Sequence, residues 1–176
     1  MPARRSSAAR TTVADATATD ADTLVISHVF DASRALVWAA WTERTHLDKW
    51  QGAPEGVTVT VEQSDIRPGG AFRICMHAPD GKDHWLQGVY REVVAPERLV
   101  FTHTWLDAAG KPGPETLVRI TLTERGDRTE LTLRQTGFTS PASRDGHREG
   151  WASTFTNLGR YLSGHAARHS DTGRIS

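Results

Sequence analysis

The sequence predicts an α+β fold in which a curved antiparallel sheet packs against one long C-terminal helix. Three observations support this prediction. A strand-like run opens the domain, six more follow a short Trp-bearing helix with turns between them, and an amphipathic helical stretch ends the domain. Consecutive strands joined by short turns pair in antiparallel fashion. A sheet that curves around a helix leaves a hollow, and aromatic side chains are available to line it.

Length and composition exclude several classes of protein. At 176 residues, the chain is long enough to bury its own core as one domain. Its 21 Lys and Arg residues balance 21 Asp and Glu residues, so no excess positive charge attracts nucleic acid or anionic lipid. Cys75 is the only cysteine, which excludes an intrachain disulfide and favours a reducing, cytoplasmic location. No apolar run approaches the ~20 residues of a membrane span.

Both ends of the chain are expected to lie outside the folded domain. Residues 1–22 are rich in Ala, Thr, Ser, Asp and Arg and hold almost no large apolar side chain. They therefore cannot bury enough surface to offset the entropy of ordering. We interpret 1–22 as a disordered N-terminal tail, 23–166 as the domain and 167–176 as a loose C-terminal tail.

The domain begins with a strand and a short helix. The strand has a two-residue period, and the residues of one of its faces are Leu24, Ile26, His28 and Phe30. Ser33 is a capping residue for the helix that follows, which carries Trp41 on its apolar side. A second helical turn over 46–50 ends at Gly52, where Gly and Pro interrupt the pattern.

Six further strands follow, separated by turn residues such as Pro79-Asp80-Gly81. They are expected at 57–62, 72–76, 84–94, 98–105, 117–124 and 129–136. Alternation places Phe72 and Met76 on one strand face. The inward face of 84–94 is ambiguous, because Trp85 alternates with the equally apolar Leu86.

The last helix is expected to begin near Ser143 and to lay one apolar stripe on the sheet. The stripe consists of His147, Trp151, Phe155, Leu158 and Leu162. Their spacings of four and three residues match one face of a helix with about 3.6 residues per turn.

Several short motifs carry a resemblance to a known family. They are Phe30-Asp31-Ala32-Ser33 before Val37-Trp38, Arg67-Pro68-Gly69-Gly70 with Phe72, Gly88-Val89-Tyr90-Arg91-Glu92 through Pro96-Glu97-Arg98-Leu99, Leu133-Arg134-Gln135-Thr136-Gly137-Phe138, and Asp145-Gly146-His147 with Gly150-Trp151. In this order they resemble the activator-of-heat-shock-protein-ATPase-like family of the START-like, or SRPBCC, superfamily. The resemblance spans residue 23 to about residue 165. It implies a helix-grip fold, in which the long helix closes a seven-stranded sheet around a deep apolar cavity.

The leading hypothesis is that this cavity binds a small hydrophobic or aromatic molecule, without a cofactor. The candidate ligand-binding residues are Trp41, Trp50, Phe72, Met76, Trp85, Phe101, His103, Trp105, His147, Trp151 and Phe155. Aromatic residues of this kind also form plain cores, so the sequence leaves both readings open. His103 shares its strand face with Phe101, where burial favours the neutral imidazole.

Two alternatives remain beside the ligand carrier. One is a cyclase, dehydratase or hydrolase on a polyketide-like substrate, with His103, His147 or Tyr90 moving protons. The other is a stress-response or chaperone-associated partner protein, which the family resemblance implies. The superfamily includes members of each kind, and a shared fold does not fix a function. A homodimer is a further option by family analogy.

Motifs for metal binding and nucleophilic catalysis are weak, so no catalytic or metal residue is assigned. His165 and His169 have an i, i+4 spacing, but no third ligand lies near them in the sequence. His77 and His84 flank a turn and are expected to face each other as an exposed pair. Cys75 has no base arranged beside it and is expected to be inert.

Overall fold

The computed structural model describes residues 21–51 and 56–171, with side chains up to residue 168. Seven antiparallel strands form one curved sheet in the order β1-β7-β6-β5-β4-β3-β2. The strands are β1 (Thr23–Phe30), β2 (Thr58–Ser64), β3 (Ala71–His77), β4 (Asp83–Val94), β5 (Arg98–Trp105), β6 (Thr116–Arg125) and β7 (Arg128–Thr136). The helices are α1 (Arg34–Thr42), α2 (Arg44–Trp50) and α3 (Pro141–Asp171). The predicted α+β fold and its seven strands are confirmed.

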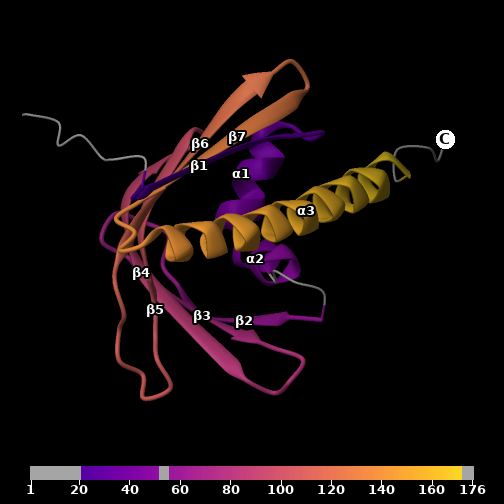
Figure 1. The fold of residues 1–176 in the computed structure, drawn as a ribbon. Helices are drawn as coiled ribbons and strands as arrows, with labels where there is room; N and C mark the ends of the chain where they lie inside the picture. The colour runs from indigo at the N-terminus through magenta and orange to yellow at the C-terminus, as the bar shows by residue number, and fades with distance from the viewer. Residues whose placement is uncertain (1–20, 52–55, 172–176) are drawn as a thin grey trace, which may run out of the picture.

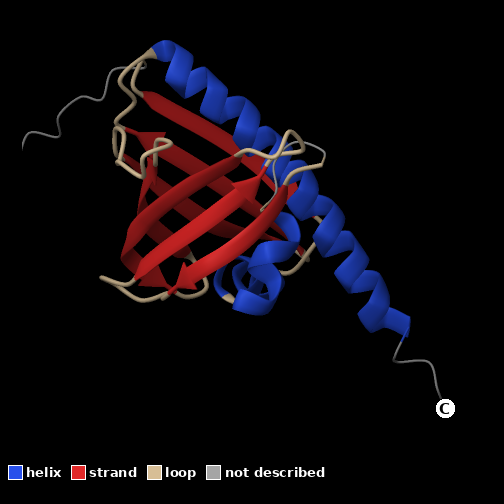
Figure 2. Cartoon of the chain, turned by 90° about the horizontal axis from the view of Figure 1, so that it is seen from below, coloured by secondary structure: helices blue, strands red, loops and turns tan. Residues whose placement is uncertain are grey.

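The sheet curves around α3, as Figure 1 shows. This helix lies on the concave side, between the half made by β1, β7 and β6 and the half made by β2, β3 and β4. Viewed from below, α3 crosses the whole width of the sheet, and the α1–α2 pair packs beside it (Figure 2). The space that the sheet encloses is therefore bounded by α3 and by the short helices.

Local signals fix the helix starts. The Ser33 hydroxyl accepts a hydrogen bond from the backbone N–H of Leu36, as the predicted cap of α1. Helix α3 starts slightly earlier than expected. Its first residue is Pro141, and the hydroxyl of Ser140 accepts from the N–H of Ser143 at 3.1 Å. Proline suits the first helical position, because the N–H that it lacks would have no intrahelical partner there.

The structure describes less of the predicted N-terminal tail than of the predicted C-terminal tail. Residues 1–20 of the expected N-terminal tail lie outside the described residues, as does Gly52 after α2. At the other end, α3 continues to Asp171, beyond the expected domain boundary at residue 166. Each added helical residue contributes one backbone hydrogen bond, so a helix that has formed extends by a further turn at little cost.

The two short helices form a corner beside the middle of α3. The indole N–H of Trp50 donates to the carbonyl oxygen of Ala40 at 2.9 Å, which ties α2 to α1. The Trp41 and Trp50 rings pack with their centroids 4.7 Å apart. Trp41 also packs against Trp151 of α3, at a centroid distance of 6.3 Å. The three Trp rings thus form a continuous aromatic surface from the α1–α2 corner to α3.

Candidate functional site

A cavity of about 500 Å³ lies among β3, β4, β5, α3 and the α1–α2 corner. It brings together all but two of the predicted site residues. From the sheet come Phe72, Met76, Phe101, His103 and Trp105. From the helices come Trp41, Trp50, His147 and Trp151. The side chains of one short helix pair, three strands and one long helix thus converge on the same space.

Trp85 and Phe155 were expected at this site, and the structure places both elsewhere. Trp85 points to the outer face of the sheet, where the Arg73 guanidinium carbon lies 4.7 Å from its ring centroid. Register decides this, because Leu86 pairs with the inward-facing Ile74 and leaves its neighbour Trp85 outside. Phe155 is only 2% exposed and packs in the core, outside the cavity lining.

The cavity also has lining residues that were not singled out as site residues. On the sheet side they are Ile74, Leu86, Tyr90 and Leu99. Ile74 and Leu99 share strand alternation with predicted residues, so the two-residue period contained the signal to find them. Leu86 and Tyr90 lie on the face of β4 opposite to Trp85, and only the register with β3 shows that this face is the inner one. Gln51 follows α2 and also lines the cavity, but no sequence pattern pointed to it.

His103 is the polar group most enclosed among these aromatic rings. Its side chain is buried, and its Nδ1 atom has no hydrogen-bond partner among the described residues. Burial first, and His147 second, lower the pKa of His103 to about 3. The imidazole is therefore neutral at physiological pH. A neutral ring can offer one donor and one acceptor to a bound molecule.

His147 is committed to two hydrogen bonds instead. The indole N–H of Trp105 donates to its Nε2 at 3.1 Å. Its Nδ1 lies 2.8 Å from the carbonyl oxygen of Ser143, to which it must donate because a carbonyl oxygen only accepts. Both nitrogens are thus engaged, and this fixes the tautomer of the ring. His147 holds Trp105 against α3 and has no free nitrogen for a proton transfer.

A buried chain of hydrogen bonds joins the helix to the strand that carries His103. The indole N–H of Trp151 donates to Oε1 of Gln135 at 2.7 Å. The amide of Gln135 donates to the hydroxyl of Thr116 at 2.8 Å. Thr116 then donates to the backbone carbonyl oxygen of His103 at 3.1 Å. The chain positions the Trp151 wall of the cavity relative to β5.

Two more buried polar atoms belong to residues of the cavity lining. Trp41 Nε1 and Gln51 Oε1 have no hydrogen-bond partner among the described residues. A buried polar atom without a partner costs about 1–3 kcal/mol. Both atoms are themselves enclosed by protein, so a ligand in the cavity would meet them only after a side-chain movement.

Acid is expected to destabilise the protein through His103. Its folded-state pKa of about 3 lies below the ordinary 6.5 of an unfolded histidine. Between these pH values the unfolded chain binds one more proton than the folded chain. Stability should therefore fall as the pH drops from 6.5 toward 3, by about 1.4 kcal/mol per pH unit. Denaturant unfolding at pH 7 and pH 5 measures the loss. His103→Gln should reduce it by about 2 kcal/mol, and equal losses in both proteins would contradict the assignment.

Comparison with known proteins defines first the class and then the family. A curved antiparallel sheet closed over a long C-terminal helix is the helix-grip arrangement of START-like proteins. Residues 31–163 match the family model described as "Activator of Hsp90 ATPase homolog 1-like protein". The chain belongs to this family, which confirms the resemblance of its sequence motifs. No curated protein matches the chain significantly.

Solved structures agree with this assignment. A crystal structure of a protein from Chromobacterium violaceum has 26% identity and a TM-score of 0.72, with 80% of this chain and 96% of that chain covered. One from Mycobacterium smegmatis has the same identity and TM-score, covering 83% and 94%. An NMR structure from Arthrobacter aurescens reaches a TM-score of 0.74 at 26% identity, covering 82% and 87%. Among the described helices, none has the length and apolar character needed to cross a membrane.

Proposed function

We propose that the protein binds a small hydrophobic or aromatic molecule in the cavity between the sheet and α3. The observation that carries this proposal is an apolar cavity of about 500 Å³ that aromatic side chains of the sheet and the helices line. Its volume falls in the range of about 300 to 1,000 Å³ of small-molecule sites. Family membership is consistent with a binding scaffold of this kind.

The lining indicates the chemistry of the ligand. Aromatic walls such as Phe101 and Trp151 favour stacking or edge contacts with a planar ring. None of the described residues that line the cavity is Asp, Glu, Lys or Arg. A charged ligand would therefore lose its hydration without gaining an ionic partner. We infer an uncharged hydrophobic or aromatic molecule.

Binding is better supported than turnover by the titratable groups of the cavity. A general acid or base works best when its pKa lies near the ambient pH. Burial lowers the pKa of His103 to about 3 and raises the pKa of Tyr90 to about 12, with a weaker opposing effect from a Ser64 hydrogen bond on the latter. His147 has both nitrogens engaged. The cyclase, dehydratase or hydrolase alternative therefore gains no support from these three residues.

Filling the cavity tests the proposal. Ile74→Trp adds bulk at a lining residue of β3. It should weaken binding of the fluorescent probe anilinonaphthalene sulfonate several-fold while the fold persists, because a cavity accepts added volume that a solid core resists at a cost of about 1–3 kcal/mol. Fluorescence titration measures the affinity, and thermal unfolding monitors the fold.

The matched control is Val25→Trp, which adds the same ring at an exposed position of β1. It should leave probe affinity unchanged. Equal affinities of Ile74→Trp and the wild type would place the probe outside the cavity. If no hydrophobic probe binds the wild type and Ile74→Trp unfolds, the space is closed in solution. The surface would then be the place to search for a protein partner, the chaperone-associated alternative.

A further inference from the structure

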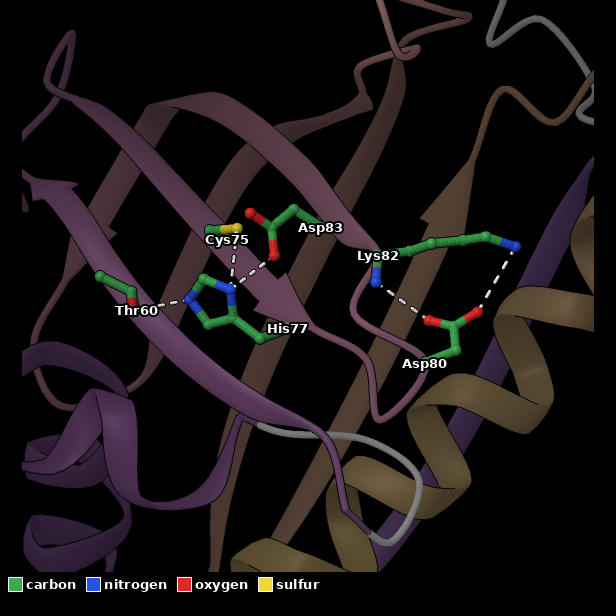
Figure 3. A network of polar contacts seen from close by, with 6 residues as sticks. All are labelled: Thr60, Cys75, His77, Asp80, Lys82 and Asp83. Carbon is green, nitrogen blue, oxygen red and sulfur yellow. Dashed lines mark hydrogen bonds and ion pairs between the residues drawn. The ribbon is translucent and has the colours of Figure 1, made fainter.

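Three metal-ligating side chains converge on the outer face of the sheet, away from the cavity. Nδ1 of His77 lies 3.7 Å from the sulfur of Cys75 and 2.7 Å from a carboxylate oxygen of Asp83. One ligand atom from each of the three lies within 4.8 Å of the others. Figure 3 shows the three side chains pointing toward one another from β3 and β4. Neither Cys75 nor His77 lines the cavity.

The β3–β4 hairpin holds these groups in place. His77 and Asp83 are direct cross-strand partners, and Cys75 precedes His77 by two residues and therefore shares its face. The turn between them is closed by the backbone N–H of Ala78 donating to the carbonyl oxygen of Lys82 at 2.9 Å. The expected pairing of His77 with His84 is wrong, because His84 pairs with Met76, one residue out of phase.

We propose that Cys75, His77 and Asp83 bind a divalent cation of the Zn²⁺ class. A thiolate, an imidazole and a carboxylate together are a donor set that Zn²⁺ accepts, whereas Mg²⁺ and Ca²⁺ prefer oxygen ligands only. Three protein ligands leave a fourth tetrahedral position for water or another small ligand. Cys75 was expected to be inert because the sequence shows no base arranged beside it. The hairpin places His77 and Asp83 next to it.

The observed spacing fits a tetrahedral cation after a small adjustment. Bonds of about 2.0 to 2.3 Å place tetrahedral ligand atoms about 3.3 to 3.6 Å apart. The 3.7 Å between sulfur and Nδ1 is already close to this value. The 2.7 Å between Nδ1 and the carboxylate must open. Asp83 is free to make that movement, because its side chain is 52% exposed.

Thr60 supplies the outer contact that metal-bound histidines require. Its hydroxyl oxygen lies 2.9 Å from Nε2 of His77 (Figure 3). When Nδ1 binds the cation, the ring proton resides on Nε2, and the hydroxyl oxygen of Thr60 accepts a hydrogen bond from this N–H. Such a contact fixes both the tautomer and the orientation of the ring. Cys75 is buried, but its ligand atom lies within 4.8 Å of those of the partly exposed His77 and Asp83, so a cation bound between these two also reaches the sulfur.

The thiol must lose its proton for the cation to bind. Burial first, and Asp83 second, raise the pKa of the Cys75 thiol, so the residue is protonated in the absence of metal at neutral pH. Binding of Zn²⁺ is therefore coupled to proton release. The affinity should fall as the pH decreases.

Titration of the tag-free, chelator-treated protein with Co²⁺ tests the site. Co²⁺ should give the visible absorption of a tetrahedral complex and a near-ultraviolet thiolate-to-metal band, both abolished by Zn²⁺ in excess. Cys75→Ser should remove the thiolate band, and His77→Gln should weaken binding at least about tenfold. Asp83→Asn changes a side chain that is 52% exposed, so the fold should persist, and it should also weaken binding at least about tenfold.

His84→Gln is the matched control, because it removes a neighbouring histidine of the same hairpin that points to the opposite face. It should leave both the spectrum and the affinity unchanged. Three outcomes overturn the proposal. They are the absence of a thiolate band in the wild type, a band that survives in Cys75→Ser, and an affinity that Asp83→Asn leaves intact. The last two would assign Co²⁺ binding to other residues.

Discussion

Gly88→Ala should destabilise the protein by about 3 kcal/mol or more, near the upper end of what overpacking causes. A Cβ atom at this position would lie 1.8 Å from the carbonyl oxygen of Thr102 and 2.5 Å from the Phe72 ring. Both are fixed, the first because Thr102 pairs with Leu117 of β6 and the second by packing against Phe101 at a centroid distance of 5.5 Å. Gly88 is therefore the point where Phe72, a wall of the cavity, lies directly over the sheet backbone.

The measurement is denaturant unfolding of Gly88→Ala beside Gly146→Ala. Gly146 also lines the cavity, but a Cβ there meets nothing within 4 Å. In helix α3 the added methyl group should stabilise the protein, by up to about 1 kcal/mol. Opposite signs for the two variants are the expected result. A loss below about 1 kcal/mol in Gly88→Ala would mean that the strands and the Phe72 ring move apart freely.

Strand alternation predicted most of the fold and much of the site. Phe72 and Met76, like Phe101 and His103, follow a two-residue period. Because one face of the sheet is covered, this period identifies the residues that point inward. The antiparallel pairing of the strands from β2 to β7 followed from the short turns between them, whereas the place of β1 beside β7 did not. These features depend on residues that are close together in the chain, so a single sequence is enough to predict them.

The features of the site that the sequence did not predict depend on contacts between different strands and helices. Both faces of β4 carry apolar side chains, and only its register with β3 places Leu86 inside and Trp85 outside. Phe155 lies one helical turn after Trp151 on the same stripe, yet packs in the core against Phe30 at 6.1 Å between ring centroids. One helical turn of α3 is therefore enough to pass from the cavity lining to the core.

Whether aromatic residues enclose a cavity or fill a core is a second property that local patterns do not contain. Trp41, Trp50 and Phe101 would be buried in either case. The difference is a matter of volume, which depends on how far α3 and the α1–α2 corner lie from the sheet. The Cys75, His77 and Asp83 cluster likewise required the hairpin register, since only the pairing of His77 with Asp83 shows that the carboxylate lies on the same face as the other two.

Trp151→Ala should cost about 3 to 5 kcal/mol of stability and also weaken probe binding. The indole is both a wall of the cavity and the first donor of the buried chain that runs through Gln135 and Thr116 to His103. Its removal leaves Oε1 of Gln135, a residue with 0% exposure, without a partner. Denaturant unfolding and fluorescence titration measure the two effects. Full stability with unchanged affinity would remove Trp151 from both roles.

Trp151→Phe separates the hydrogen bond from the bulk of the ring. It retains an aromatic wall but leaves Gln135 unpaired, which should cost about 1–3 kcal/mol. Adding Gln135→Met should recover part of this loss, because the unpaired oxygen is then absent, and the pair should show a coupling energy of at least about 0.5 kcal/mol. Additive losses would mean that the bond contributes nothing to stability. Coupling that appears in probe affinity as well as in unfolding would show that this chain, by holding α3 to the strand of His103, keeps the cavity in its binding shape.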